Sequence, residues 1–396
     1  MRFSSVPGGA GWRSGAERAV KTAGPRFRYR RGPVSYRRVS PSGHSFRAPH
    51  SMAIRLIYNH IEHHAGHSGY DQMAKYVDGK PYSEGLFFRL FKRLPKKIVD
   101  RIPATKTPWY WGKALPRELE MCVRCLIPKK TLYHFFYAEN DLRLSSRFRP
   151  RFNNRIVASF HQPPEYLDTH VEDKRYIQGL DAAVVVSRYQ IPYMSRFLPE
   201  DRIFCVPHGV DADYWRPDSS VEKWDQPTFL FVGFWLRDVD MFAATVKRAA
   251  EIGLSARFRV VTFAEHRQHF EGLPNTDVLS VIPDEDLLSE YRRAHAIFLP
   301  LKFATANNAI LETMSCGTAV ITTQSGGVVE YIEPGCGTAV PRGDVEAAVA
   351  ALREIAGSRN LMLERGAAAR RRAEEFAWPK VGSMMNEAYR RILSGR

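Results

Sequence analysis

Polar residues interrupt an apolar α/β pattern in the segment 303–330, which reads FATANNAILETMSCGTAVITTQSGGVVE. A loop ending in Asn307 and Asn308 leads into a short helix pattern with a single acid, Glu312. Backbone N–H groups at a helix start are preorganised for anions, and the helix dipole adds to this preference. Capping of the helix would explain Asn307 alone, but it leaves Glu312 on the same turn unexplained. The segment therefore predicts a ligand-facing loop.

A second candidate is the loop after the first strand pattern, MAIRLIYNH at 52–60. The next residues read IEHHAGHSG, and a helix is predicted to begin near Ser68, with Asp71 completing a capping box. Gly66 and Gly69 would let a phosphate or sugar approach the backbone closely. The four histidines of this part of the chain lack carboxylate or cysteine ligands at defined spacing. They are interpreted as polar loop residues rather than a metal site: His60, His63, His64 and His67.

His161 follows the buried-strand pattern RIVASF (155–160) directly, at the start of HQPPEYL. Ligands of open parallel sheets bind at the carboxyl ends of strands, where this residue is expected. Pro163 and Pro164 would fix its position. The alternative is a loop histidine bonded to the backbone; we favour a functional residue.

The net charge of +16 is concentrated at the start of the chain. Residues 1–51 carry eleven Lys/Arg and one acid, with no apolar period, and are predicted to form a disordered basic tail. An organelle-targeting peptide, an electrostatic arm and an early start codon before Met52 all explain such a tail, and we favour the last. The remaining charge is modest, so no nucleic-acid partner is expected.

Five cysteines in 396 residues do not make a disulfide framework, which favours a cytoplasmic protein. Cys122 and Cys125 form a C-x-x-C without a second pair, so no zinc site is predicted. No apolar run approaches the roughly 18 residues that a membrane-spanning helix needs.

Residues 86–102, LFFRLFKRLPKKIVDRI, combine large apolar side chains with six Lys/Arg and a single acid, Asp100. This composition is typical of an interfacial amphipathic segment, although Pro95 must interrupt any helix. A core-facing helix with a solvated basic face explains the same pattern. Both interpretations stay open on the sequence alone.

Strand and helix patterns alternate twice along the chain, which predicts an α/β protein with two Rossmann-like domains. Further strand patterns are DAAVVVS (181–187), TFLFVGF from 228, RFRVVTF, HAIFLPL and GTAVITT. A polar, Pro-containing linker lies near 216–226. The expected division is a tail at 1–51, an acceptor-side domain at 52–218, a nucleotide-sugar domain at 219–375 and a last helix at 376–396.

The order of these motifs resembles the GT-B-fold retaining glycosyltransferases of the large fourth family, the group 1 glycosyl transferases, across nearly all of 52–396. The matching pieces are HHAGHSG, SFHQPPEYL, DAAVVVS, VPHGVDADYWRP, FLFVG, the block from YRRAHAIFLPL to GGVVEYI, and RRRAEEFAWPKV. The resemblance implies two facing domains and a C-terminal helix that crosses back onto the first.

The resemblance also implies roles for individual residues. The donor diphosphate would lie on Asn307, Asn308 and Ala309 and beside Gly233, and the family's equivalent of Glu312 accepts hydrogen bonds from the ribose hydroxyls. A carboxylate suits such a diol because it can accept from both hydroxyls. His161 and Glu312 are the expected catalytic residues, with His161 positioning hydroxyls of the acceptor or the donor sugar.

Two departures from the family pattern stand out. Ala304 occupies the position of a glutamate that reaches the donor sugar, and Phe234 occupies that of a phosphate-binding arginine. Arg237 and Lys302 are the nearest cations and are expected to neutralise the diphosphate instead.

The predicted activity is transfer of a sugar from a nucleoside-diphosphate donor to a glycan or lipid-linked acceptor, with retention and without metal or cofactor. Since a lipid-linked acceptor lies in a membrane, the protein is expected to contact the inner face of an anionic membrane peripherally. A non-catalytic nucleotide- or glycan-binding protein, favoured by Ala304, and a sugar-nucleotide epimerase on the same fold are the alternatives.

Overall fold

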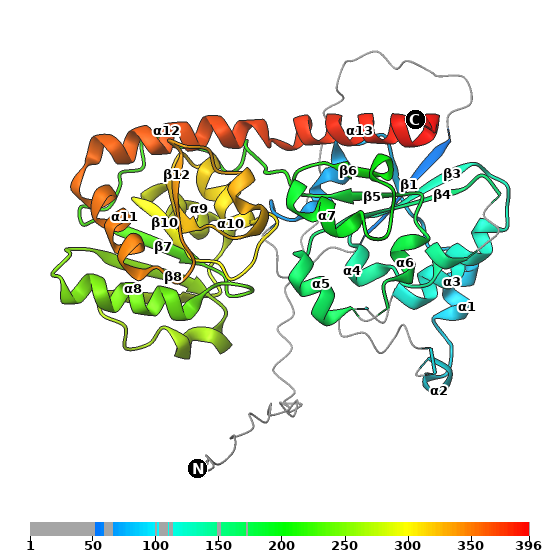
Figure 1. Ribbon diagram of the computed structural model, residues 1–396, viewed down its shortest axis with the longest axis horizontal. Helices are drawn as coiled ribbons and strands as arrows, with labels where there is room; N and C mark the ends of the chain where they lie inside the picture. The colour runs from blue at the N-terminus through cyan, green and yellow to red at the C-terminus, as the bar shows by residue number, and fades with distance from the viewer. Residues whose placement is uncertain are drawn as a thin grey trace, which may run out of the picture. The chain divides into compact units, whose positions relative to one another are not determined.

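The strands that the structure describes form two parallel sheets of six strands each (Figure 1). The computed structural model describes residues 52–58, 66–99, 101–102, 110, 114–148, 152–171 and 173–395. The predicted basic tail, residues 1–51, lies outside these residues, as do His60, His63 and His64.

The first sheet has the strand order β2-β1-β3-β4-β5-β6, and every neighbouring pair is parallel. Its strands are β1 (Ala53–Ile57), β2 (Lys80–Pro81), β3 (Thr131–Phe135), β4 (Arg155–Phe160), β5 (Ala182–Val185) and β6 (Ile203–Cys205). The helices between them are α1 (Leu86–Phe91), α2 (Lys96–Val99), α3 (Ala114–Cys125), α4 (Ala138–Asp141), α5 (Pro164–His170), α6 (Arg175–Gln178) and α7 (Ile191–Met194).

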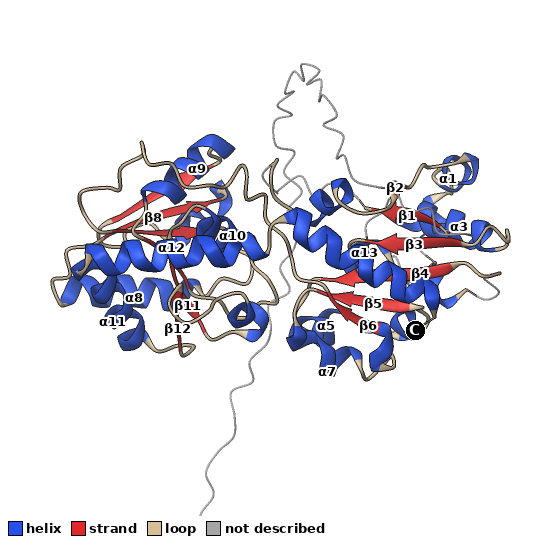
Figure 2. Ribbon diagram, turned by 90° about the horizontal axis from the view of Figure 1, so that it is seen from above, coloured by secondary structure: helices blue, strands red, loops and turns tan. Residues whose placement is uncertain are grey.

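Neighbouring residues of a strand point to opposite faces of this sheet, and both faces are buried. On β1, Ile57 packs in a cluster that includes Met121 of α3, whereas Leu56 packs in a cluster that includes Trp378 and Tyr389. The last two residues belong to α13 (Trp378–Ser394), which lies over the first sheet in Figure 2. Two covered faces explain why these strands read as apolar runs rather than as alternating patterns.

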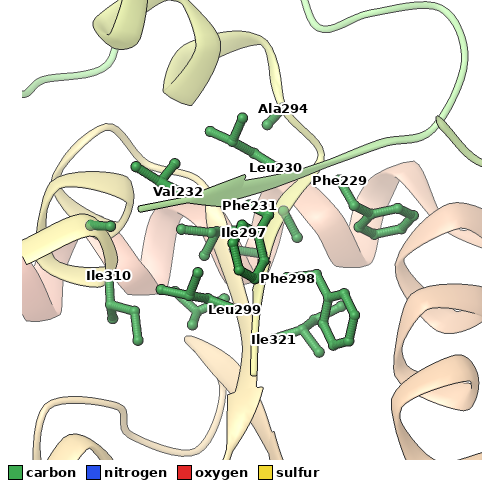
Figure 3. Packing of buried hydrophobic residues seen from close by; sticks show 14 of the residues in the cluster. Phe229, Leu230, Phe231, Val232, Ala294, Ile297, Phe298, Leu299, Ile310 and Ile321 are labelled. Atoms are coloured by element: carbon green, nitrogen blue, oxygen red, sulfur yellow. The ribbon is translucent and has the colours of Figure 1, made fainter. Parts of the chain in front are cut away.

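The second sheet has the order β12-β11-β10-β7-β8-β9, again with parallel neighbours throughout. Its strands are β7 (Thr228–Val232), β8 (Arg257–Thr262), β9 (Thr276–Ser280), β10 (Ala296–Leu299), β11 (Ala319–Thr323) and β12 (Gly337–Val340). Its helices are α8 (Val239–Glu251), α9 (Asp284–Arg293), α10 (Asn308–Ser315), α11 (Val345–Gly357) and α12 (Arg359–Glu375). Figure 3 shows its core, where Phe231, Phe298 and Ile310 are fully buried.

This architecture confirms the predicted α/β class with two Rossmann-like sheets. We call the elements from β1 to β6, together with α13, the first lobe, and those from β7 to α12 the second lobe. The helix α13 follows the second lobe in sequence yet packs on the first sheet, as expected for a crossover helix. The join between the sheets, 206–227, contains no named helix or strand, and the predicted boundary at 218/219 falls within it.

Five of the described strands were not predicted: β2, β3, β6, β9 and β12. The most consequential is β3, a fully buried central strand. Its sequence, TLYHF, carries a histidine that breaks the apolar run. The buried His134 ring has a hydrogen-bond partner at each nitrogen, since Tyr389 and Ser159 lie 2.6 and 2.8 Å from them. Partners so distant in sequence cannot be read from the strand itself.

Residues 86–99 form two short helices, α1 and α2, with Pro95 between them, as the proline required. Phe88 is buried and anchors α1, which contacts α3. Leu86, Phe87 and Leu90 are exposed. The described helices include none that is both long and apolar enough to pass through a membrane.

Candidate functional site

A cavity of about 550 Å³ is lined by residues that follow strands of both sheets. Tyr137 and His161 come after β3 and β4 of the first lobe, and Gly233, Phe263 and Phe303 come after β7, β8 and β10 of the second. The carboxyl ends of parallel strands are the usual ligand sites of such sheets. Seven of the predicted site residues line the cavity: His161, Gly233, Arg237, Asn307, Asn308, Ala309 and Glu312.

Glu312 of α10 is buried at the cavity wall, and both of its carboxylate oxygens accept hydrogen bonds. Ser68 of the first lobe donates its hydroxyl to Oε1, and Tyr291 of α9 donates to Oε2 at 2.8 Å. Burial raises the pKa of this carboxyl, although both hydroxyls oppose the shift. Two of the roughly four lone-pair positions of the carboxylate remain for a ligand.

The contact with Glu312 corrects the predicted capping box at Ser68. The helix there is a 3₁₀ helix, Tyr70–Lys75, whose N-cap is Gly69, and it has no side-chain cap. The Ser68 hydroxyl faces the second lobe instead. A local pattern was therefore overridden by a partner 244 residues away.

The N-terminus of α10 presents two backbone donors to the cavity. The Asn307 side chain caps the helix by accepting from the N–H of Ile310 at 3.2 Å. Among the residues that the structure describes, no acceptor bonds the N–H of Asn308 or Ala309. The cap thus accounts for Asn307, and the two residues after it supply a site for an anion.

Arg237 is the only Lys or Arg among the described residues that line the cavity. Its guanidinium donates to the carbonyls of Val232 at 3.1 Å and Trp235 at 2.8 Å. No carboxylate of the described chain lies within ion-pair distance of it. Burial lowers its pKa to about 10, with Tyr291 and Glu312 opposing the shift. A desolvated guanidinium without a carboxylate partner favours an anionic ligand.

Gly233 makes room for this guanidinium. Its φ is +84°, a conformation that L side chains rarely adopt. A Cβ atom at this position would lie 3.1 Å from Nη2 of Arg237. Glycine therefore lets Arg237 fold back over the end of β7.

The other predicted donor-binding residues lie outside the cavity lining. Lys302 is exposed, and its Nζ lies 3.4 Å from Asp240, so the geometry gives no support for a phosphate contact. The N–H of Gly66 donates to Asp284 Oδ2 at 2.7 Å. Gly69, with φ +98°, starts the 3₁₀ helix.

His161 is half-buried and held from two sides. Its Nε2 lies 2.7 Å from the carbonyl of Phe136, and its backbone N–H donates to Glu139 at 2.6 Å. Burial lowers the pKa of the imidazole, more than Glu139 and the Phe136 carbonyl raise it. In the neutral ring, donation by Nε2 leaves Nδ1 as an acceptor. The ring thus bonds the backbone and also lines the cavity.

Sequence reasoning missed other polar residues of the cavity, notably Glu139, His208 and Tyr291. Glu139 was missed with the strand β3 that precedes it. His208 stands shortly after β6 in VPHGVD, and this placement after a strand, like that of His161, was the available signal.

Aromatic side chains line the cavity on the second-lobe side. Phe234 stacks on His266 with ring centroids 3.7 Å apart. Trp235 and Phe263 are 51% and 41% exposed. Such surfaces can pack against the faces of sugars or bases. Within the described ranges, no three His, Cys, Asp or Glu residues are grouped so that they could hold a metal ion.

Comparisons with known proteins agree with this geometry. Residues 226–358, about a third of the chain, match the family model of glycosyl transferases group 1. No curated protein matches the chain.

Solved structures resemble a larger part of the chain. Sucrose-phosphate synthase from Thermosynechococcus elongatus is 18% identical, with a TM-score of 0.60 over 74% of this chain and 81% of its own. A glycosyltransferase from Rickettsia africae is 15% identical, with a TM-score of 0.60 over 87% and 99%. The pneumococcal O-GlcNAc transferase GtfA, solved with UDP and GlcNAc, is 12% identical, with a TM-score of 0.53 over 72% and 61%. The chain therefore has the two-domain GT-B fold.

Proposed function

We propose that this protein is a glycosyltransferase that moves a sugar from a nucleoside-diphosphate-sugar donor to an acceptor hydroxyl with retention of configuration. One observation carries the proposal. The open N–H groups of Asn308 and Ala309, the guanidinium of Arg237 and the carboxylate of Glu312 all line one cavity. This is the set of groups that a diphosphate and a ribose require together. The group 1 family match of the second lobe supports it, and retention rests on the resemblance.

The chemistry follows from where charge develops. The acceptor oxygen bonds to the anomeric carbon while the bond from that carbon to the phosphate oxygen breaks, and the acceptor proton passes to the departing diphosphate. Fixed amide donors and Arg237 stabilise this anion without reorganising. Glu312 holds the ribose, and His161 accepts a hydroxyl from the first-lobe side. The proposed reaction uses neither metal nor cofactor.

Nucleotide binding is the first test. We expect the protein to bind at least one of UDP, GDP and ADP in calorimetry, because the phosphate and ribose groups are present before the sugar is considered. Absence of binding to all three at millimolar concentration would contradict the proposal.

A non-catalytic nucleotide- or glycan-binding protein is the second candidate. Ala304 favours it, since this buried residue lines the cavity where the resemblance implies a glutamate. Hydrolysis of a bound nucleotide sugar separates an enzyme from such a protein, and analysis of the products separates transfer from epimerisation.

The acceptor is proposed to be a glycan or a lipid-linked molecule met at the cytoplasmic face of an anionic membrane. Leu86, Phe87 and Leu90 of α1 are 68%, 42% and 51% exposed, although Phe88 between them is buried. Four exposed cations without a carboxylate partner in the described chain lie near them in the sequence: Arg89, Lys92, Arg93 and Lys97. Each cation near an anionic leaflet contributes about 1 kcal/mol, and apolar burial adds to it.

Vesicle sedimentation tests this contact. The full chain is expected to pellet with anionic but not neutral vesicles, and less so as salt rises from 0.1 to 1 M, where the Debye length falls from about 10 to about 3 Å. Serine at positions 86, 87 and 90 together should reduce pelleting, whereas Leu363→Ser, at an exposed leucine of α12, should not. Because the basic tail is present in every variant, equal pelleting of all three proteins would refute a role for α1.

A further inference from the structure

Glu139 is the cavity's second carboxylate. Among the described residues that line the cavity, only Glu139 and Glu312 are acidic. Glu139 stands four residues after β3, in the short helix α4, and is 1% exposed. A carboxylate so deep in the protein needs donors for both of its oxygens.

One oxygen has its donors. Oε1 of Glu139 accepts from the backbone N–H of His161 at 2.6 Å and from that of Gln162 at 2.9 Å. The carbonyl of His161 accepts in turn from the hydroxyl of Thr305 in the second lobe. That carbonyl and the Gln162 N–H belong to one peptide unit. Glu139 therefore lies one peptide away from the segment containing Ala304 and Thr305.

The other oxygen differs from those of Glu312. Both Glu312 oxygens receive a protein hydroxyl. In contrast, none of the described residues donates a hydrogen bond to Oε2 of Glu139. Glu139 belongs to the cavity lining, and Oε2 is the oxygen left for a ligand group there. A carboxylate oxygen selects a donor, such as a sugar hydroxyl.

We propose that Glu139 is a specificity-determining residue that accepts a hydrogen bond from a hydroxyl of the transferred sugar. The inference rests on the proposed function, and it deepens it by placing the sugar against the first lobe. Ala304 of the second lobe offers no polar side chain to the sugar. The carboxylate of Glu139 lies on the other side of the His161–Gln162 peptide, whose carbonyl accepts from Thr305, the residue after Ala304.

The variant Glu139→Gln separates this role from a structural one. Its amide oxygen can still accept from the two backbone N–H groups, while its NH₂ replaces Oε2 and presents a donor where the sugar hydroxyl needs an acceptor. Glu165→Gln is the matched control. Glu165 is also in the first lobe and accepts from Tyr189, but it does not line the cavity.

Calorimetry with two kinds of probe gives the readout. The nucleoside diphosphate that binds best among UDP, GDP and ADP is compared with its sugar forms, such as UDP-glucose, UDP-N-acetylglucosamine, GDP-mannose and ADP-glucose. We expect Glu139→Gln to keep the wild-type affinity for the nucleotide and to lose about tenfold or more in affinity for the sugar form, the scale of a charge-assisted hydrogen bond. Glu165→Gln should match the wild type with both.

Several outcomes would overturn the inference while the proposed function stands. One is a Glu139→Gln variant that binds the sugar form as the wild type does. Another is a parallel loss of affinity for both probes together with a lower melting temperature, which would indicate a purely structural residue. A wild type that gains nothing from the sugar would exclude the contact as well. Failure of the wild type to bind any nucleotide would instead refute the proposed function itself.

Discussion

Glu312→Ala is expected to weaken nucleoside-diphosphate binding by about 1.5–3 kcal/mol, roughly 10- to 150-fold in Kd. The carboxylate lies in the cavity wall, and its two protein donors leave lone pairs for a ribose diol. Alanine removes the acceptor and leaves nothing of similar reach on α10. Calorimetry with the nucleotide that the wild type binds measures the loss directly.

A stability control is needed because Glu312→Ala also removes the acceptor of two protein hydroxyls. Ser68 and Tyr291 would both lose their acceptor, at about 1–3 kcal/mol for each buried group left unpaired. Glu312→Gln keeps an acceptor and the side-chain volume, so we expect it to retain its melting temperature while still losing part of the nucleotide affinity. Nucleotide binding at wild-type strength in both variants would remove Glu312 from the donor site.

The pH dependence of nucleotide binding tests the role of Glu312 in a second way. Burial raises the pKa of the Glu312 carboxyl above the ordinary glutamate value. In the proposed complex the ionised form of Glu312 accepts from the ribose, so nucleotide affinity should fall as the pH drops through this raised pKa. Phosphate groups titrate near pH 6 as well. The Glu312→Gln profile contains only that contribution, and the difference between the two profiles isolates Glu312.

Much of the fold could be predicted because single strands carry their own signal. Runs such as RIVASF and TFLFV are buried on both faces of parallel sheets, so they stay apolar along their length. The loop before α10 was predictable for a similar reason, since Asn307 caps a helix whose sequence follows at once. Local chemistry decided these features, and local reasoning found them.

Features that depend on distant partners could not be predicted in this way. The Ser68 hydroxyl looked like a helix cap, but its partner is Glu312. The strand β3 was missed because His134 interrupts its apolar run. The partner of this buried ring, Tyr389, lies 255 residues away in α13. Missing β3 also concealed Glu139 at its carboxyl end. Both of these errors came from a polar side chain whose hydrogen bond only the folded chain supplies.

Charge was the least predictable property of the site. Arg237 and Lys302 looked equivalent in sequence, as cations of two neighbouring loops. In the structure, two backbone carbonyls, those of Val232 and Trp235, hold Arg237 in the cavity lining, whereas Lys302 lies near Asp240 at the surface. A short glycine-containing turn with φ +84° at Gly233 makes the difference. The backbone conformation of Gly233 thus leaves room for the cation that lines the cavity.

His161→Ala is expected to lower turnover by about 100-fold while leaving nucleotide affinity nearly unchanged. The groups proposed to bind the nucleotide belong to the second lobe, whereas His161 lines the cavity from the end of β4. Its Nε2 is engaged by the Phe136 carbonyl at 2.7 Å, and burial keeps the ring neutral by lowering its pKa. Nδ1 is then the atom that can accept a hydroxyl of the sugar or the acceptor and align it for reaction.

Two amide variants test which nitrogen matters. Glutamine at 161 can keep the donor to the Phe136 carbonyl but lacks an acceptor at the Nδ1 position, so its turnover should be as low as that of His161→Ala. Asparagine can place an amide oxygen near the Nδ1 position and should recover part of the rate.

The pH profile of the wild type tests the same nitrogen. Because the folded-state pKa of His161 lies below 6.5, titration of this ring should not change the rate between neutral and mildly alkaline pH. The contribution of His161 should be lost only when acid protonates Nδ1. Turnover of the bound nucleotide sugar, measured alongside the nucleotide Kd, checks each step. Full activity of His161→Ala would show that the ring only supports the loop, which is the alternative that its bond to the Phe136 carbonyl also allows.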